Sequence, residues 1–193
     1  LNAWLAAHGW LVFKEGRQGC GEWFEGVDWS RTQAFALGLS GIYLNRVGRE
    51  SQGVVTRGEA PALVEEIGQA LTGLSGPEGE AVRRIVDPRK EFAGPFMDDA
   101  PDIIVGYTRG HRASWDSVRG LVRPGAEVFE PNTKAWSGDH CIDPDEVPGV
   151  IATNRPLDLD GAGIADLAPT LLDLFGVPAP RHMDGRSLAP PPA

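Results

Sequence analysis

Cysteine is scarce in this sequence of 193 residues, which has only Cys20 and Cys141, far apart along the chain. Neither belongs to a Cys-x-x-Cys pair, and the chain has no series of regularly spaced cysteines. The pattern therefore supports neither a cysteine zinc cage nor a disulfide framework. A single disulfide between the two cysteines is left open.

Long apolar runs are also missing. The longest ones are far shorter than the roughly 18 apolar residues of a membrane-spanning helix. No charged start followed by an apolar stretch resembles a signal peptide. We therefore expect no membrane segment in this chain. The first residue is Leu1 rather than Met, and an amphipathic stretch begins there, so we expect further residues upstream.

Positive charge is in deficit. The chain has 18 Lys and Arg against 27 Asp and Glu, which gives a formal net charge of −9. A protein that follows nucleic-acid phosphates needs the opposite sign, so a nucleic-acid polymer is not the expected partner. An acidic chain can still act on a small phosphoester where bound metal ions supply positive charge, because such an ion dominates the field in its own site.

Strand and helix patterns follow one another and predict an α/β fold. Residues 32–45 predict two short strands joined by a turn, and residues 81–86 and 102–107 predict two more. Pro61 opens a predicted helix whose apolar residues recur at steps of three and four. These residues are Leu63, Val64, Ile67, Ala70, Leu71 and Leu74.

The last third of the chain predicts one more strand and one more helix. We expect residues 149–153 to pair in one sheet beside strand 102–107, with a helix at 164–175 packed on its face. Asp166 is the expected cap of that helix. The polar stretch at 110–137, rich in Gly and Pro, predicts a long ordered loop, and residues 189–193 a loose proline-rich tail.

Three blocks of sequence stand in a fixed order near the end of the chain. They are Trp136-Ser-Gly-Asp-His140 with the text up to Asn154, Asp166-Leu-Ala-Pro-Thr170 with its Gly-Val-Pro178 exit, and Met183-Asp-Gly-Arg-Ser-Leu188. Together they resemble the C-terminal end of the type I phosphodiesterase and nucleotide pyrophosphatase branch of the alkaline phosphatase superfamily. The resemblance implies an α/β/α sandwich with a central mixed sheet. Residues 1–188 would be the C-terminal portion of one such domain, whose N-terminal part is absent.

The same resemblance implies a chemistry. The complete enzyme would hydrolyse phosphate mono- or diesters, nucleotides among them, with two divalent metal ions, preferably zinc. His140 is the metal ligand that this chain would supply. The Thr or Ser nucleophile and the other ligands would lie upstream of Leu1, so we expect the isolated chain to be inactive. From the residues alone, the alternative for His140 is a loop histidine without a metal.

A basic cluster follows the predicted strand at 102–107. Arg109, His111 and Arg112 are candidates for binding a phosphate or ribose oxygen. The alternative is a solvated loop held by salt bridges. Two other functions stay open: a sulfatase or phosphonate hydrolase on the same scaffold, and a non-catalytic module that binds a partner or sugar through loop 110–137.

Overall fold

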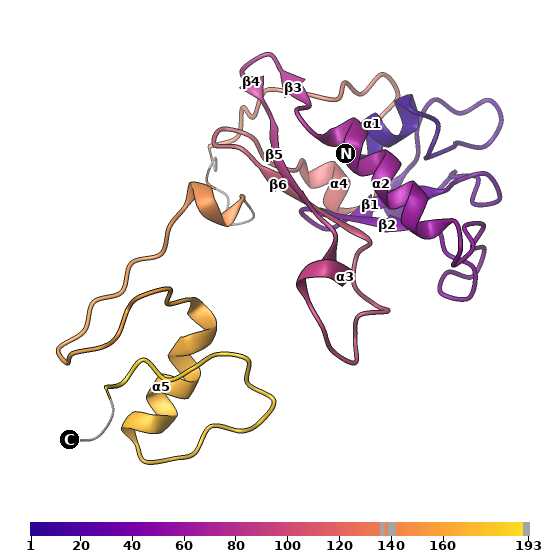
Figure 1. The fold of residues 1–193 in the computed structure, drawn as a ribbon. Coiled ribbons are helices and arrows are strands. Elements are labelled where there is room, and N and C mark those ends of the chain that lie inside the picture. Colours follow the sequence, from indigo (N-terminus) through magenta and orange to yellow (C-terminus); the bar gives the residue numbers. More distant parts are fainter. Residues whose placement is uncertain (136–137, 139–141, 191–193) are drawn as a thin grey trace. The chain divides into compact units, whose positions relative to one another are not determined.

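The computed structural model describes residues 1–135, 138 and 142–190 of the chain, which divides into two compact units, Leu1–Pro148 and Gly149–Ala193 (Figure 1). The elements of the first unit are α1 (Asn2–Ala7), η1 (Glu22–Phe24), β1 (Ala34–Leu37), β2 (Gly41–Leu44), α2 (Ala60–Leu71), β3 (Ser75–Gly76), β4 (Gly79–Glu80), β5 (Val82–Val86), α3 (Pro88–Glu91), β6 (Ile103–Tyr107), α4 (Trp115–Val118) and η2 (Pro144–Glu146). The second unit contains η3 (Ile164–Asp166) and α5 (Leu167–Leu174). Among the described residues, no helix is both long and apolar enough to cross a membrane.

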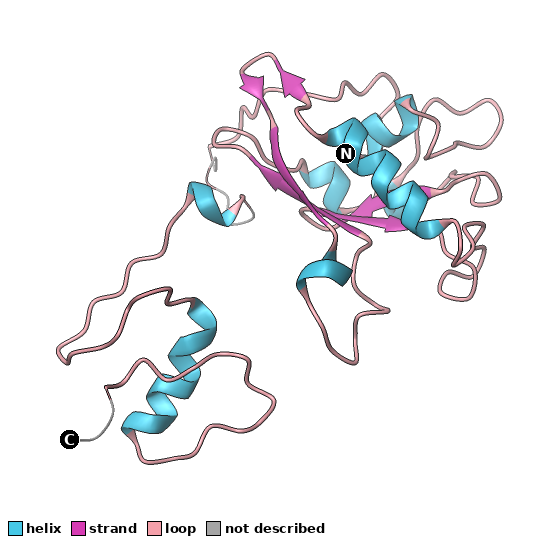
Figure 2. Cartoon of the chain, viewed as in Figure 1, coloured by secondary structure: helices cyan, strands magenta, loops and turns pink. Residues whose placement is uncertain are grey.

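The first unit is built on a four-stranded sheet in the order β1-β2-β6-β5 (Figure 2). Its three pairings are all antiparallel, with Ala34 opposite Leu44, Ile42 opposite Ile103 and Val86 opposite Ile104. β6 is therefore an inner strand, and Ile103, Val105 and Tyr107 on it are buried. The expected α/β class is confirmed, although the sheet implied by the resemblance was mixed.

Helices cover this sheet with apolar side chains. α2 packs on β5 and buries Leu63, Ile67 and Leu71, the members of its predicted stripe that face the sheet. Gly68 lets the helix come close, because a Cβ there would lie 3.3 Å from the Cγ2 of Ile85. Both α1 and α4 contact β1. The strands predicted within 32–45, 81–86 and 102–107 and the helix opened by Pro61 are thus confirmed.

The N-terminal segment covers the free edge of β1. The buried Asn2 amide donates to the Ala36 carbonyl at 2.8 Å, and its oxygen accepts the Ala36 N–H at 2.7 Å. The Trp10 carbonyl accepts the N–H of Ala34 at 3.1 Å. One side chain and one loop carbonyl therefore take the hydrogen bonds that a fifth strand would otherwise take.

A buried carboxylate lies just before β6. Asp102 is fully buried, and one of its oxygens accepts the Leu44 N–H at 2.8 Å. The guanidinium of Arg49 lies 2.6 Å from the same oxygen, Oδ2. The guanidinium groups of Arg89 and Arg46 lie 2.9 Å and 3.7 Å from the other oxygen, Oδ1. Charge is balanced in this way because an unpaired buried carboxylate would be very costly.

Arg49 shows how strong this pairing is. Burial by itself lowers the pKa of Arg49, because desolvation disfavours the charged form. The hydrogen bond and charge of Asp102, with help from Glu50, more than offset this, so the pKa of Arg49 lies above its ordinary value. Arg49 therefore stays charged, and it also joins the ends of β2 and β6 by donating to the Leu44 carbonyl at 2.8 Å.

The second unit is organised around Asp166 and Thr170. The carboxylate of Asp166 accepts the N–H of Gly163 at 2.8 Å and that of Arg186 at 2.7 Å. The hydroxyl of Thr170 accepts the N–H of Leu188 at 2.9 Å, and Leu188 is fully buried. The block 183–188 is thereby bound to the start of α5. Asp166 is the residue before α5, but its side chain makes no capping hydrogen bond to that helix. Its carboxylate instead binds the Gly163 N–H at the start of η3.

Gly185 is required where this block crosses η3. A Cβ at position 185 would lie 2.1 Å from the Ala165 carbonyl oxygen, so a side chain there would collide with backbone. Arg186 then donates to the Asp160 carbonyl at 2.7 Å and pairs with Asp158 at 3.1 Å. The Asp-Gly-Arg sequence thus attaches the C-terminal block to η3 and to the loop that contains Asp158 and Asp160.

The strand predicted at 149–153 is wrong. These residues form an exposed irregular segment, and the side chain of Val150 is 96% exposed. The run is β-branched, but strand preference depends on a paired neighbour and a surface to pack on. Within the described part of the second unit there is no sheet that could provide either.

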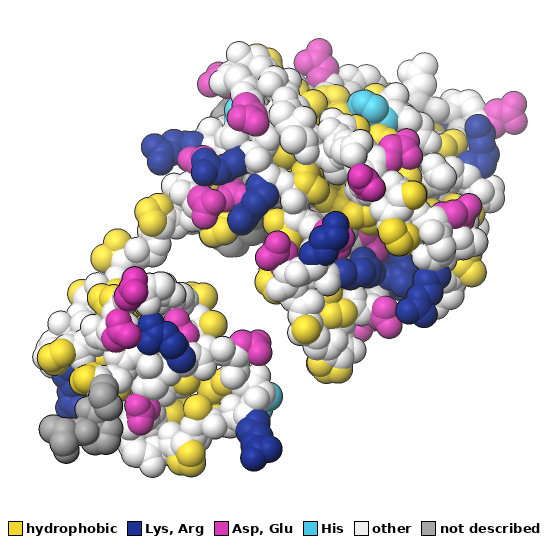
Figure 3. Space-filling view, in the orientation of Figure 1, with side chains coloured by type: hydrophobic (Ala, Val, Ile, Leu, Met, Phe, Trp, Pro, Cys, Tyr) yellow, Lys and Arg dark blue, Asp and Glu magenta, His cyan; other side chains and the backbone are white. Residues whose placement is uncertain are grey.

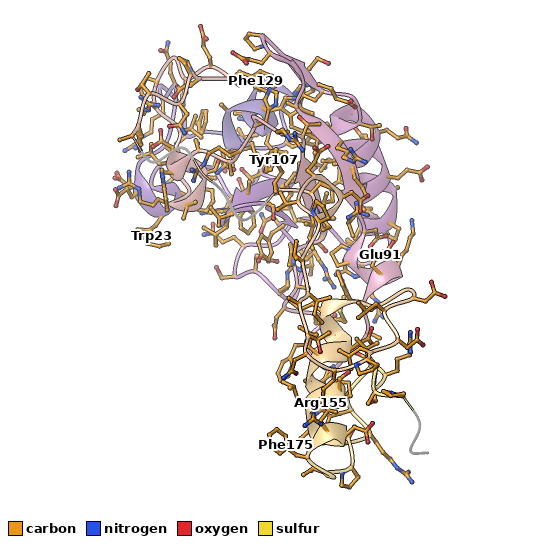
Figure 4. The ribbon with its side chains drawn as sticks, turned by 90° about the vertical axis from the view of Figure 1, so that its left-hand side faces the viewer. Trp23, Glu91, Tyr107, Phe129, Arg155 and Phe175 are labelled. Carbon is orange, nitrogen blue, oxygen red and sulfur yellow. The ribbon has the colours of Figure 1, made fainter. Side chains whose placement is uncertain are left out.

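The helix predicted at 164–175 is present as the turn η3 followed by α5. Its apolar stripe is exposed in this structure, with Ile164 at 88% and Phe175 at 82% (Figure 4). Packing of this helix on the sheet stays a prediction, as does the single domain over residues 1–188. Of the proposed tail, residues 191–193 lie outside the described residues.

We expect Asp102→Ala to lower the free energy of unfolding by about 3–5 kcal/mol, because it removes a fully buried carboxylate that pairs with the mostly covered Arg49 and accepts the Leu44 N–H. Urea denaturation followed by tryptophan fluorescence measures the change. As a control, Glu25→Ala removes the exposed partner of Arg17 and should cost less than about 1 kcal/mol. Equal losses in the two variants would contradict the role assigned to Asp102.

The hydrogen bonds from the backbone N–H groups of Gly163 and Arg186 lower the pKa of the Asp166 carboxyl below its ordinary value of 3.8. Because the pKa is lower in the folded state, the charged carboxylate stabilises the fold at mildly acidic and neutral pH. This contribution is lost as the pH falls through the lowered value. A carboxyl-carbon NMR titration, assigned with Asp166→Asn, should give a midpoint below 3.8, and a midpoint at or above 3.8 would contradict this account.

Candidate functional site

The predicted metal ligand His140 lies outside the described residues, as does Cys141. Described residues stand on both sides of it: Gly138 before, and Ile142 and Asp143 after. The structure shows what these flanking residues contact. They contact the loop that follows β6 and the end of β6 itself, so the candidate site can be built from these contacts.

Arg112 contacts the residue on the N-terminal side. Its Nη1 donates to the Gly138 carbonyl at 2.9 Å. The guanidinium carbon lies 5.7 Å from the ring centre of Trp115, which is within the range of a cation–π contact. Both contacts hold the guanidinium close to the loop backbone. Phosphate binding by Arg112 stays a prediction.

The two other basic residues of the predicted cluster lie in the same loop but have different surroundings. The His111 ring has its Nδ1 3.1 Å from the Thr108 hydroxyl and meets the Phe129 ring edge-on at 6.1 Å. The Arg109 side chain is 83% exposed, and its Nε lies 3.9 Å from a Glu146 carboxylate oxygen. Arg109, His111 and Arg112 thus share one loop, and their role in binding substrate stays a prediction.

Asp143 contacts the end of β6 from the C-terminal side. Its N–H donates to the Tyr107 carbonyl at 3.2 Å, and its side chain is fully buried. The Nε of Arg84, on the neighbouring strand β5, lies 3.0 Å from its Oδ2. Figure 4 shows Tyr107 within the first unit. Asp143 is therefore attached to both β6 and β5.

Asp143 also begins the short helical turn η2. Its Oδ1 accepts the N–H of Asp145 at 3.0 Å, and Pro144 occupies the first position of the turn. An Asp followed by Pro is a typical start of a helical turn. Arg83 pairs with Glu146 at 2.6 Å and so attaches the turn to β5 a second time.

Asp143 and Gly106 also contribute to this site, although neither was predicted from the sequence. A Cβ at position 106 would lie 2.4 Å from the Oδ2 of Asp143, so the carboxylate occupies space that only a glycine leaves open. The Asp-Pro pair was a readable signal for the turn. The contact with Gly106 could not be read from the sequence, because the two residues are far apart along the chain.

The metal expected from the resemblance can be tested only against the described residues. Among them, no group of three or more His, Cys, Asp or Glu side chains is placed to hold an ion. An imidazole is a suitable zinc donor, so His140 fits as one contributed ligand. The fit is limited to that donor, and a complete zinc site needs further ligands.

Other chemically interesting residues have structural roles. The Asp28 carboxylate accepts the Ser30 hydroxyl at 2.6 Å, and the Thr32 hydroxyl accepts the Val12 N–H at 3.0 Å. These bonds form the turn before β1. His8 stacks on Trp10 with ring centres 5.3 Å apart. Burial raises the pKa of the Cys20 thiol, so this buried cysteine is a poor nucleophile.

Arginines of the first unit lie beside carboxylates. On the face drawn in Figure 3, the Lys and Arg side chains of the first unit gather in groups with Asp and Glu beside them. The arginines nearest to Asp143 are paired with carboxylates. The expectation that nucleic acid is not a partner stays a prediction.

Comparison with known proteins gives a limited similarity. No family model matches the chain, and no solved structure matches it. A stretch of 25 residues is 72% identical to part of a protein from Drosophila melanogaster named extracellular sulfatase SULF-1 homolog. The match covers 13% of this chain and 2% of that protein. Sulfatases belong to the alkaline phosphatase superfamily, so this short match is consistent with a hydrolase lineage on that scaffold.

Proposed function

We propose that the complete protein is a metal-dependent hydrolase of phosphate mono- or diesters, small nucleotides included, and that this chain is its C-terminal part. His140 would bind one of two divalent ions, preferably zinc. The nucleophile, a Thr or Ser, would lie upstream of Leu1. When bound, such an ion pair supplies charge to activate the nucleophile and to stabilise the leaving oxygen.

The proposal rests on the contacts that the resembling blocks make within the fold. The Asp166-to-Thr170 block and the 183–188 block bind each other through one partly buried and one buried hydrogen bond. The residues on either side of His140 are held by Arg112 and by the end of β6. The last two blocks, which come in the order of the resembling family, thus form one hydrogen-bonded unit here.

A second candidate is hydrolysis of sulfate esters. The 25-residue match to a protein named as a sulfatase favours it. The same scaffold would serve, and the difference would lie in the nucleophile and the metal ligands upstream. Parallel assays of the complete protein on an aryl phosphodiester, an aryl phosphomonoester and an aryl sulfate separate the two. A non-catalytic module would turn over none of the three.

In the complete protein, His140→Ala should remove close to one equivalent of bound zinc and strongly reduce turnover while leaving the fold intact. The substitution removes one ligand and no core volume. Elemental analysis measures the zinc, and circular dichroism checks the fold. The matched control is His8→Ala, which removes a histidine stacked on Trp10 in the first unit. Equal zinc content in the wild type and in His140→Ala would refute the ligand assignment.

Residues 1–193 expressed alone and supplied with zinc should show no turnover of an aryl phosphodiester beside an active complete protein. One histidine falls short of the three or four ligands that hold zinc, and no activated nucleophile is identified beside it. The exposed apolar stripe of α5 should also make the short chain prone to association, which light scattering measures. Robust zinc-dependent turnover by the short chain would contradict the placement of the catalytic residues upstream.

A further inference from the structure

Three arginines surround the buried carboxylate of Asp102, and one of them has all its hydrogen-bond donors in use. The guanidinium of Arg49 has five N–H groups, and these meet five acceptor oxygens, which belong to Leu44, Glu50, Asp98, Ala100 and Asp102. Its charge is matched by the Asp102 Oδ2 at 2.6 Å and the Glu50 Oε1 at 2.7 Å. Arg49 therefore has a purely structural role.

Arg46 and Arg89 lie beside the other oxygen of the same carboxylate, Oδ1. Their Nη1 atoms lie 3.7 Å and 2.9 Å from it, respectively. Neither approach forms a hydrogen bond: the Nη1 of Arg46 and the Oδ1 of Asp102 are both buried without a hydrogen-bond partner among the described residues. A buried donor of this kind calls for an explanation, and an anion or water bound close by is a common one.

The charge around Oδ1 is only partly balanced. Asp102 shares its charge with Arg49, so two further guanidinium groups face part of one carboxylate. Asp98 also lies nearby, 3.9 Å from the Nη2 of Arg46, but its side chain is 95% exposed. Solvent screens an ion pair of this kind, so it contributes little. The positive charge of Arg46 and Arg89 is thus available to a further anion.

The backbone holds both arginines in place before any ligand binds. The N–H of Arg46 donates to the Glu50 carboxylate at 2.8 Å, and the N–H of Arg89 donates to the Asp87 carboxylate at 3.0 Å at the start of α3. The Arg46 side chain is 16% exposed and that of Arg89 is 38% exposed. Both guanidinium groups are thus partly covered and still reach the surface, and little conformational freedom remains to be lost on binding.

We propose that Arg46 and Arg89 together bind a free tetrahedral oxyanion, phosphate or sulfate, at the surface beside Asp102. A guanidinium presents N–H groups in a planar fork that matches two oxygens of such an ion. Asp102 holds the two guanidinium groups close together and does not touch the ion. The site uses no residue assigned to the hydrolase function above, so the inference goes beyond that function.

The test titrates sodium phosphate into the metal-stripped complete protein at low ionic strength and measures the heat of binding. Removing the metal prevents the proposed metal centre from competing for the anion. Arg89→Gln should weaken phosphate binding at least about tenfold, because it removes charge-assisted hydrogen bonds. Arg46→Lys keeps the charge but loses the planar fork, so it should also weaken binding. If Arg46→Lys does not fold, Arg89→Gln decides.

The choice of anion is a second part of the test. Sulfate should give a saturable heat as phosphate does, because both ions are tetrahedral and doubly charged. Chloride at the same ionic strength should give none. Absence of saturable binding of phosphate and sulfate by the wild type, or equal binding of chloride, would overturn the inference.

The matched control is Arg119→Gln. Arg119 is an arginine of the first unit with a side chain that is 48% exposed, and it pairs with the Glu22 carboxylate. Its replacement removes the same charge at a different place, so phosphate affinity should stay that of the wild type. Thermal unfolding without phosphate checks that each variant is folded. If Arg119→Gln weakens phosphate binding as much as Arg89→Gln, the effect comes from net charge alone and the inference is wrong.

Arginine-selective NMR gives the place of binding. The Nε–Hε signals of Arg46 and Arg89, assigned with the two variants, should shift during the phosphate titration with the midpoint found by calorimetry. If Arg112→Gln lowers the affinity and Arg89→Gln does not, phosphate binds at the loop after β6 and the inference is overturned. That result would leave the proposed hydrolase function standing, because zinc content and turnover test it separately.

Discussion

The first unit depends on how β6 is held at its two ends. β6 is an inner strand, and a buried carboxylate lies beside each end of it: Asp102 before it and Asp143 after it. Each carboxylate is neutralised by arginines from other segments and also binds backbone. β6 thereby acquires a fixed position relative to β2, to β5 and to the loops that leave it. Hydrophobic burial alone would not set these positions, because apolar contacts have little directional preference.

Much of the first unit could be predicted from the sequence, because its patterns are local. The apolar steps of α2 and the turn between β1 and β2 can each be read from a short stretch of sequence. The run at 149–153 is, like β6, rich in β-branched residues, yet it forms no strand. The difference is a neighbour: β6 has β2 and β5 on either side, and a single-sequence pattern does not contain that information.

The candidate site was predictable to a smaller extent. Arg109, His111 and Arg112 were identified because they are charged and adjacent in the sequence, and they do share a loop. The contact of Asp143 with Gly106 was missed because it joins residues that are distant along the chain, and a glycine has no side chain to suggest a role. Distances in space, rather than residue types, distinguish Arg112, bound to the Gly138 carbonyl, from the largely exposed Arg109.

The amide of Asn2 has a consequence for how the sheet can grow. The Asn2 amide binds the N–H and carbonyl of Ala36 on the outer edge of β1, and the Trp10 carbonyl accepts the N–H of Ala34. An additional strand, from the same protein or from another copy, would first have to displace a buried side chain and the helix that carries it. Extension of the sheet past β1 is therefore blocked, as in proteins that protect their edges against aggregation. β5 forms the opposite edge of the sheet.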